Sequence, residues 1–140
     1  MKLTSIEVLK LLEDVRGSVS NDHFIEHSIC VGNAAGLIAK ALNLDEDYAK
    51  ILGYIHDIGK KFNYEKNEVF AHEVYGYNYI KSLGYDDEYA GICVKHSFLN
   101  NDVECTSSDR EEIDKNSPNY EFVKNYIKEE YSIYDKIINL

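Results

Sequence analysis

The 140-residue sequence has no tryptophan, one proline and only three cysteines. Low proline, together with many Ile, Leu, Ala, Glu and Lys residues, favours helix over other regular structure. The cysteines are odd in number and form no CxxC pair, so neither a disulfide framework nor a cysteine zinc site is indicated. This use of cysteine predicts a reducing, cytoplasmic setting.

Long apolar runs and basic clusters are also missing. No segment approaches the roughly 20 apolar residues of a membrane span, and the first residues lack the apolar run of a signal peptide. The formal net charge is −10, without a patch of five or more lysines and arginines. We therefore expect no membrane partner and no binding to duplex nucleic acid through phosphate neutralisation. A nucleotide stays within reach, because a bound metal supplies positive charge locally.

Hydrophobic residues make up 44% of the chain, enough for a core, and they recur at helical spacing. The length fits one domain, so we expect a single all-α domain over residues 1–140. The predicted helices span residues 5–16, 22–42, 46–58, 71–83, 86–96 and 117–140. The polar stretch before the last of them, residues 100–118, has no apolar period, and we interpret it as a lid.

A histidine followed by an aspartate, His56-Asp57, falls in the last turn of the third predicted helix, which Gly59 is expected to end. A neutral imidazole beside a carboxylate suits a divalent metal such as Mn, Fe, Co, Ni or Zn. Lys60 follows three residues after Asp57 and could meet an anion such as phosphate. The dipeptide alone is common by chance, so the prediction of a metal site depends on where the other histidines lie.

Those histidines fall on separate predicted helices. His27 lies on the apolar stripe of the second helix and should face the interior, and His23, one turn earlier, could grip a zinc ion with it. The stripe consists of Phe24, Val31, Ala35, Ile38 and Leu42. His72 opens the fourth helix, where N–H groups favour an anion, and His96 ends the fifth, where histidine often complements the helix dipole. Packing or solvent exposure explains each one alone, but together with His56 they indicate a site.

The fourth predicted helix is rich in tyrosine, with Tyr75, Tyr77 and Tyr79 close together. Such spacing is more typical of mixed core and surface positions than of a platform for stacked bases. The sequence contains no Gly-rich phosphate loop, no GxSxG nucleophile elbow and no HExxH. The histidines and Asp57 therefore carry the prediction of chemistry.

The order and spacing of these residues resemble the HD-domain superfamily of metal-dependent phosphohydrolases, in particular its small stand-alone bacterial members. The matching stretches are Glu26-His27-Ser28, Ile55-His56-Asp57-Ile58-Gly59-Lys60, His72-Glu73 followed by Gly76, and Lys95-His96-Ser97. The resemblance covers about residues 20–100 and continues weakly in the final helix. It implies an all-helical bundle of five or six core helices around a metal site.

The resemblance also implies roles for the site residues. His27, His56 and Asp57 would hold one ion; where a second is present, Asp57 bridges and His72 and His96 bind it. With a single ion, these last two histidines would contact the phosphate instead. Lys60 matches a family lysine near phosphate, so Asp57 and Lys60 are the expected catalytic residues. The implied reaction is hydrolysis of a phosphate ester or anhydride by metal-activated water, in a small substrate such as a nucleotide.

One departure from the family pattern concerns a metal-binding aspartate in the last core helix. The string Tyr134-Asp135-Lys136 matches the lead-in, but the sequence ends at Leu140, before the expected ligand. Asp135 lies about two turns earlier, roughly 10 Å away, and is a poor substitute. Other candidates are Asp102, Asp109 and Asp114. Either the product is cut short, or another residue supplies the ligand, or metal binds weakly.

That departure supports an alternative function. A degenerate HD domain would bind a metal, a nucleotide or a protein partner without turnover. Separately, the final helix is apolar and has no C-terminal cap, so it could pair with a second subunit in a homodimer.

Overall fold

The computed structural model of the chain describes residues 2–17, 22–65, 68–98 and 114–138. Within these ranges every regular element is helical, as the sequence predicts. The elements are α1 (Ser5–Val15), α2 (His23–Ala41), α3 (Glu46–Ile55), the short 3-10 helix η1 (Ile58–Lys61), α4 (Ala71–Ser82), α5 (Asp87–Lys95) and α6 (Pro118–Ile138). None of the helices in the described ranges is long and apolar enough to cross a membrane.

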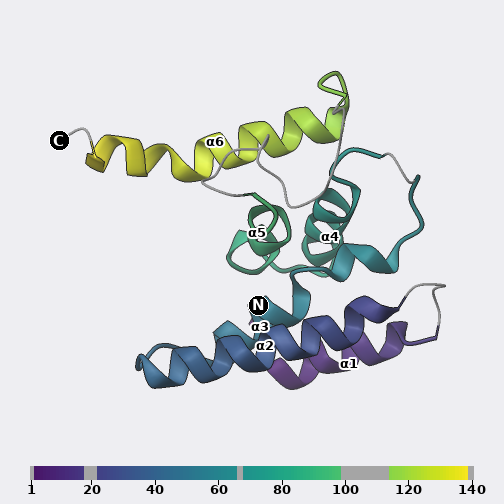
Figure 1. Cartoon of the computed structure of the whole chain (residues 1–140), viewed down its shortest axis with the longest axis vertical. Coiled ribbons are helices and arrows are strands. Elements are labelled where there is room, and N and C mark those ends of the chain that lie inside the picture. Colours follow the sequence, from purple (N-terminus) through teal and green to yellow (C-terminus); the bar gives the residue numbers. More distant parts are fainter. Residues whose placement is uncertain (1, 18–21, 66–67, 99–113, 139–140) are drawn as a thin grey trace.

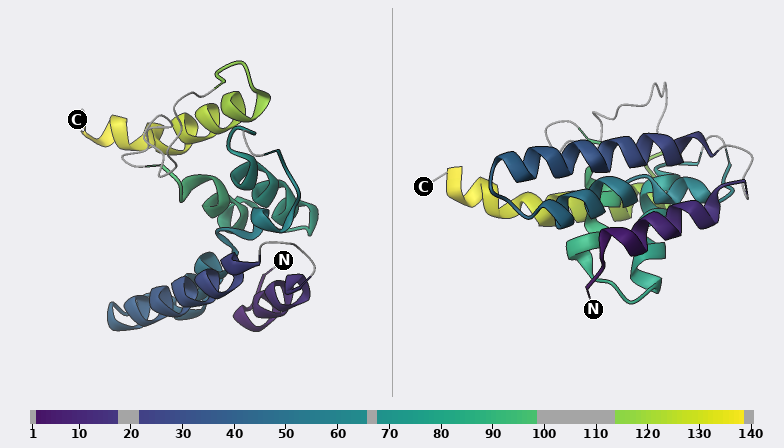
Figure 2. Two further views of the ribbon diagram at one scale, coloured as in Figure 1. Left: turned by 45° about the vertical axis from the view of Figure 1, so that its right-hand side comes forward. Right: turned by 90° about the horizontal axis from the view of Figure 1, so that it is seen from below.

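The helices form two groups, one of α1, α2 and α3 and the other of α4, α5 and α6. Figure 1 shows α1, α2 and α3 together in the lower half, α4 and α5 in the middle, and α6 across the top. The left view of Figure 2 shows the same order, with α6 on the far side of α4 and α5 from α1–α3. The 3-10 helix η1 packs against α4 and connects the two groups.

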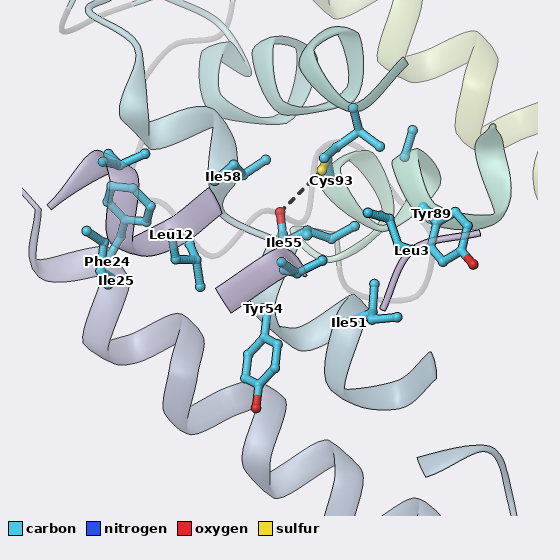
Figure 3. Close-up of a cluster of buried hydrophobic side chains, with 14 residues drawn as sticks. Leu3, Leu12, Phe24, Ile25, Ile51, Tyr54, Ile55, Ile58, Tyr89 and Cys93 are labelled. Atoms are coloured by element: carbon cyan, nitrogen blue, oxygen red, sulfur yellow. Dashed lines mark hydrogen bonds between the residues drawn. The ribbon is translucent and has the colours of Figure 1, made fainter. Parts of the chain in front are cut away.

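Two hydrophobic clusters hold these groups together. The first joins α1, α2 and α3 to η1, α4 and α5 (Figure 3). Its buried members are Leu3, Val8, Leu12, Val15, Phe24, Ile25, Ile51, Tyr54, Ile55, Ile58, Ile80, Tyr89, Ala90 and Cys93. The second consists of Val69, Phe70, Val74, Val94, Phe98, Tyr120, Val123 and Ile127. Burying one such large side chain stabilises the fold by about 1.5–3 kcal/mol. Because α5 supplies Cys93 to one cluster and Val94 to the other, its C-terminal end lies where the clusters meet.

Short polar side chains begin three of the helices. Thr4, Asp45 and Asp86 accept hydrogen bonds from backbone N–H groups in the first turns of α1, α3 and α5. Each cap satisfies a donor that has no partner within its helix and stabilises the start of that helix by about 1 kcal/mol. The starts of α3 and α5 are therefore set partly by local sequence. The C-terminal ends of these two helices lead into His56 and His96.

The buried face of α2 differs from the predicted stripe. Ile38 and Leu42 are 61% and 63% exposed. The buried positions are instead Phe24, Ile25, Ser28, Gly32, Gly36 and Ala39. A Cβ on Gly32 would lie 2.1 Å from the Tyr54 ring, and one on Gly53 would lie 2.4 Å from the Gly32 Cα. Glycines thus let α2 and α3 approach backbone to backbone, and glycine adds no hydrophobic signal by which the sequence pattern could find this face.

The third helix ends earlier than predicted, at Ile55, and His56 and Asp57 lie in the turn that leads into η1. Gly59 belongs to η1, so the prediction that it ends α3 was wrong. A Cβ at Gly59 would lie 1.9 Å from the backbone oxygen of His72. Gly59 therefore permits close contact between η1 and the first turn of α4, which brings His72 toward Asp57.

Candidate metal centre

Asp57 is the centre of a cluster of side chains that come from four parts of the fold. It lies between α3 and η1, and its carboxylate is buried. One oxygen, Oδ1, lies 3.0 Å from His96 Nε2 and 3.5 Å from His72 Nε2. The histidines at the end of α5 and the start of α4 therefore converge on a single carboxylate oxygen.

The second oxygen of Asp57 faces the other two histidines. Oδ2 lies 3.2 Å from His56 Nε2 and 3.8 Å from His27 Nε2. The exposed Lys60 places its Nζ 3.4 Å from the same oxygen. Each oxygen of one carboxylate thus serves a different pair of histidines, so a cation on either side would contact Asp57.

Three of the histidines have a close contact at Nδ1, the ring nitrogen that faces away from Asp57. His56 Nδ1 and His96 Nδ1 bond to backbone carbonyls one turn earlier in the chain, at 2.6 and 3.0 Å. His72 Nδ1 lies 2.7 Å from the buried carboxylate of Glu73. The carbonyl bonds orient His56 and His96 with Nε2 toward Asp57, and the Glu73 carboxylate lies beside His72 Nδ1 without an aligned hydrogen bond. Carbonyl or carboxylate partners on the far nitrogen are typical of histidines that bind metals.

The ionisation of the cluster favours a cation. Burial opposes the charge of Asp57, but hydrogen bonds from His56 and His96 outweigh it and hold the pKa of this carboxyl well below its ordinary range. Burial also lowers the pKa of His56, but its contacts with Asp57 produce a net rise. Burial and then the charge of Asp57 raise the pKa of the Cys93 thiol to about 12. Asp57 is therefore an ionised carboxylate, whereas Cys93 stays protonated and is not a nucleophile.

The donor set fits a divalent transition metal. Two groups of three residues have ligand atoms within 4.8 Å of one another: His27, His56 and Asp57, and Asp57, His72 and His96. Imidazole nitrogen and carboxylate oxygen suit the first-row divalent metals that the sequence predicts. The two Nε2 atoms of His72 and His96 lie 3.3 Å apart and face the same oxygen, an arrangement that one cation would satisfy. The residues offer donors for one ion or for two.

The structure brings all the predicted site residues together, with two differences from expectation. The His27 side chain is 59% exposed, so the prediction that it faces the interior was wrong. The glycines of α2 occupy the buried face, which leaves His27 at the rim of the cluster. His23 is exposed and belongs to neither donor group among the described residues, which gives no support to a zinc site formed by His23 and His27 alone.

Glu73 and Ser97 were named within the matching stretches of the sequence, but neither of them was given a role in the site. Glu73 contacts His72, and the Ser97 hydroxyl lies 3.1 Å from His96 Nε2. Each directly follows a candidate ligand in the sequence, and this adjacency was the available signal. Glu73 is buried, and its Oε1 lies 2.7 Å from His72 Nδ1 without forming an aligned hydrogen bond.

The expected C-terminal carboxylate can be followed only in part. Asp135 lies within α6, but its side chain is outside the description, as are Asp102 and Asp109 with most of the stretch interpreted as a lid. Asp114 is exposed ahead of α6, where its side chain accepts a hydrogen bond from the Asn116 N–H. In the described part of the chain, both donor groups therefore rely on Asp57 as their carboxylate.

Comparison with known proteins identifies relatives of the chain. The family model described as HD domain matches residues 24–139. Ribonuclease Y of Fervidobacterium nodosum is 34% identical over 91 residues, which cover 64% of this chain and 17% of the relative. Ribonuclease Y of Protochlamydia amoebophila is 32% identical over 109 residues, 74% of this chain and 21% of the relative. Ribonuclease Y of Clostridium botulinum is 39% identical over 61 residues, 43% of this chain and 12% of the relative.

The chain thus spans about a fifth or less of the length of these curated relatives. No solved structure matches it significantly.

The names of the relatives overturn one expectation. Sequence analysis assigned a small nucleotide-like substrate and excluded duplex nucleic acid as a partner, whereas the relatives are ribonucleases, which act on RNA. The prediction was wrong because it used the charge of the whole chain. A net charge of −10 opposes binding that depends on many phosphate contacts. Hydrolysis of one phosphodiester requires positive charge only at that phosphate, and a bound metal provides it.

Proposed function

The chain belongs to the HD-domain family, and on this premise we propose that it is a metal-dependent phosphohydrolase that cleaves phosphodiester bonds in RNA. The observation that carries the proposal is the Asp57 carboxylate, which turns one oxygen to each of two histidine pairs. The ribonuclease Y relatives support the substrate class. The proposal includes that residues 1–140 act as one domain in the cytoplasm.

The proposed ligands follow the two donor groups. His27, His56 and Asp57 would hold one ion, and Asp57 with His72 and His96 would hold a second. A divalent metal bound there lowers the pKa of water and offsets negative charge on a phosphoryl oxygen. Three protein donors leave coordination positions open, as catalytic metal sites require.

Other side chains would act on the substrate and on the ligands. The exposed ammonium of Lys60 lies beside Asp57 and can bind a phosphate oxygen, which stabilises charge as the bond breaks. Glu73 holds the ring of His72 with Nε2 toward the site. When a single ion is bound, His72 or His96 would be free to donate a proton to the leaving oxygen.

Binding without turnover is the second candidate, and one observation favours it. Among the described residues, the two donor groups share a single carboxylate, so the centre carries little negative charge for two divalent ions. A weakly held metal would leave a domain that binds metal, nucleic acid or a protein partner but does not hydrolyse phosphodiesters.

The test combines metal analysis with hydrolysis. Purified protein, supplied with Mn²⁺ or Co²⁺, should cleave both a single-stranded RNA oligonucleotide and an aryl phosphodiester. His27→Ala should reduce both activities, whereas His23→Ala, one turn earlier on the same helix and outside both donor groups, should not. Stoichiometric metal without cleavage of either substrate would support the second candidate. Full activity in a His56→Ala and Asp57→Ala double variant would disprove the site.

A further inference from the structure

An aromatic hollow next to the centre has no role in the hydrolysis described above. It is an open pocket of about 410 Å³ between the end of η1 and the outer face of α4. We call it the aromatic hollow and define it by its lining residues, Phe62, Asn63, Tyr75, Asn78, Tyr79 and Ser82. Its volume lies within the range of about 300–1,000 Å³ that is usual for ligand sites.

The rings of the hollow are held by one another. The Phe62 ring centroid lies 6.0 Å from that of Tyr75 and 5.6 Å from that of Tyr79, with the planes tilted by 69° and 71°. Tyr75 donates a hydrogen bond from its hydroxyl to Glu68. Lys61 places its Nζ 4.1 Å from the centroid of the Tyr79 ring. The hollow therefore combines fixed aromatic faces with a positive charge at its edge.

The aromatic hollow and the metal centre lie on the same elements. His72, Tyr75 and Tyr79 are spaced by three and four residues on α4, so they share one face of the helix. At 1.5 Å per residue, Tyr79 lies about 10 Å along the helix from His72. Two neighbouring lysines of η1 each contact one of the two sites. Lys60 contacts Asp57 in the metal centre, and Lys61 lies over the Phe62 and Tyr79 rings of the aromatic hollow.

We propose that the aromatic hollow binds an unpaired base of the RNA strand whose phosphodiester is cleaved at Asp57, an inference that rests on the proposed function. Aromatic faces stack on bases of any sequence, and the exposed amides of Asn63 and Asn78 can bond to base edges. Lys60 and Lys61 match the charge of the intervening phosphates. The ligand is single-stranded, because bases inside a duplex are stacked on both sides and leave no face free for the aromatic rings.

The proposal divides the tyrosines of α4 by their surroundings. Tyr77 packs against Phe122 and Tyr126 of α6 and bonds to Asp87, so it is structural. Tyr75 and Tyr79 line the hollow instead. Tyr79 also packs against the first hydrophobic cluster, as Tyr77 does, so the three side chains are the mix of core and surface positions that the sequence predicts.

The first measurement is binding without hydrolysis. A fluorescent single-stranded RNA 12-mer is titrated without added metal at low salt, and its anisotropy gives a Kd. Phe62→Ala and Tyr79→Ala should each weaken binding about tenfold, the effect of one lost stacking contact. Phe62→Tyr, which keeps an aromatic face, should bind as the wild type does. Phe122→Ala is the matched control, because Phe122 is 36% exposed, like Phe62 at 37%, but lies on α6.

The second measurement separates this proposal from the proposed function. Phe62→Ala should hydrolyse an aryl phosphodiester at the wild-type rate, because that substrate has no base for the hollow, while KM for the RNA rises about tenfold. If the wild type cleaves neither substrate, the proposed function fails, and the anisotropy still tests the hollow. Because Phe62 is exposed, its variant keeps the test valid if Tyr79→Ala does not fold.

Three results would overturn the inference. These are wild-type protein that does not bind the 12-mer, unchanged affinity in both Phe62→Ala and Tyr79→Ala, and an equal loss of affinity in Phe122→Ala.

Discussion

The two sides of Asp57 differ in how firmly the fold holds their histidines. His72 and His96 have side chains that are 23% and 17% exposed, and both have a partner at Nδ1. On the other side, His56 is similarly anchored, but His27 is 59% exposed, and no hydrogen bond to its Nδ1 is found within the described residues. One side of the centre is preorganised for an ion, and the other has a ligand at its rim.

This difference follows from where each histidine lies in the fold. His72 and His96 lie at helix ends where the two hydrophobic clusters meet, and neighbouring groups surround them. His27 lies within α2, outside the buried face that Phe24, Ile25, Ser28 and the small residues after them form. Ordering a free side chain costs about 0.5–1.5 kcal/mol on binding, so we expect His27 to contribute less net metal affinity than an anchored ligand.

The shared carboxylate gives the largest expected effect. Asp57→Asn should lower phosphodiester hydrolysis about a thousandfold and remove bound metal from both sides, because each donor group loses its anion. Elemental analysis and initial rates measure the two effects on the same preparation. Metal retained at wild-type stoichiometry would show that the two sides do not depend on Asp57.

Gly59→Ala tests the contact that brings the α4 side to Asp57. The new methyl group would lie 1.9 Å from the backbone oxygen of His72, so η1 and α4 must separate. We expect a loss of about 3 kcal/mol in the free energy of unfolding, at the upper end for overpacking. Urea denaturation measures this loss. Gly17→Ala is an informative comparison, because Gly17 has φ of +78° but open space around it, so its cost is conformational alone.

Glu73→Gln removes the carboxylate beside His72 Nδ1. The amide keeps the shape of the side chain but loses the charge beside His72 Nδ1, so metal affinity should fall about ten- to hundredfold. A competition titration with a metal chelator gives the change. Glu129→Gln, at an exposed position on α6, serves as the control and should not change the affinity. Equal affinities in the two variants would mean that Glu73 does not position His72.

His96→Ala and His27→Ala compare the sides directly. We expect His96→Ala to weaken metal binding about tenfold more than His27→Ala, because the His96 ring is already oriented and the His27 ring must be ordered. The same chelator titration measures both. A larger effect of His27→Ala would reverse the assignment of the preorganised side.

The pH dependence of stability gives the smallest effect. The contacts that raise the pKa of His56 add to the free energy of unfolding of the metal-free protein. This contribution is fully present below about pH 6.5 and is lost as pH rises through the folded-state pKa. The contacts that lower the pKa of Asp57 also stabilise the folded protein. This contribution is fully present above about pH 3.9 and is lost as pH falls through the folded-state pKa. The metal-free protein should therefore be slightly less stable at pH 8 than at pH 6.

Metal should reverse this slope, because it binds neutral imidazole and so binds more tightly at higher pH. Urea denaturation at both pH values, with and without Mn²⁺, measures the slopes. In His56→Gln the metal-free slope should be reduced; an unchanged slope would assign it to other groups.

Local sequence determined the all-helical fold, the approximate helix positions and the residues of the centre. Apolar spacing near 3.6 residues and polar caps are properties of neighbouring residues, so the pattern could be read without the fold. His56-Asp57 and three of the other four histidines (His27, His72 and His96) stood out because each lies on or next to a helix that this pattern predicts.

The tertiary structure alone decided how these residues face one another. The contact of Gly32 with Gly53 turned His27 to the rim, and the contact of Gly59 with α4 brought His72 to Asp57. Both depend on the absence of a side chain, which leaves no hydrophobic period in the sequence. The two faces of the Asp57 carboxylate and the aromatic hollow arise from the same long-range packing, because they join segments that are not neighbours in the chain. The Nδ1 partners of His56, His72 and His96 are instead local, within four residues of each ring.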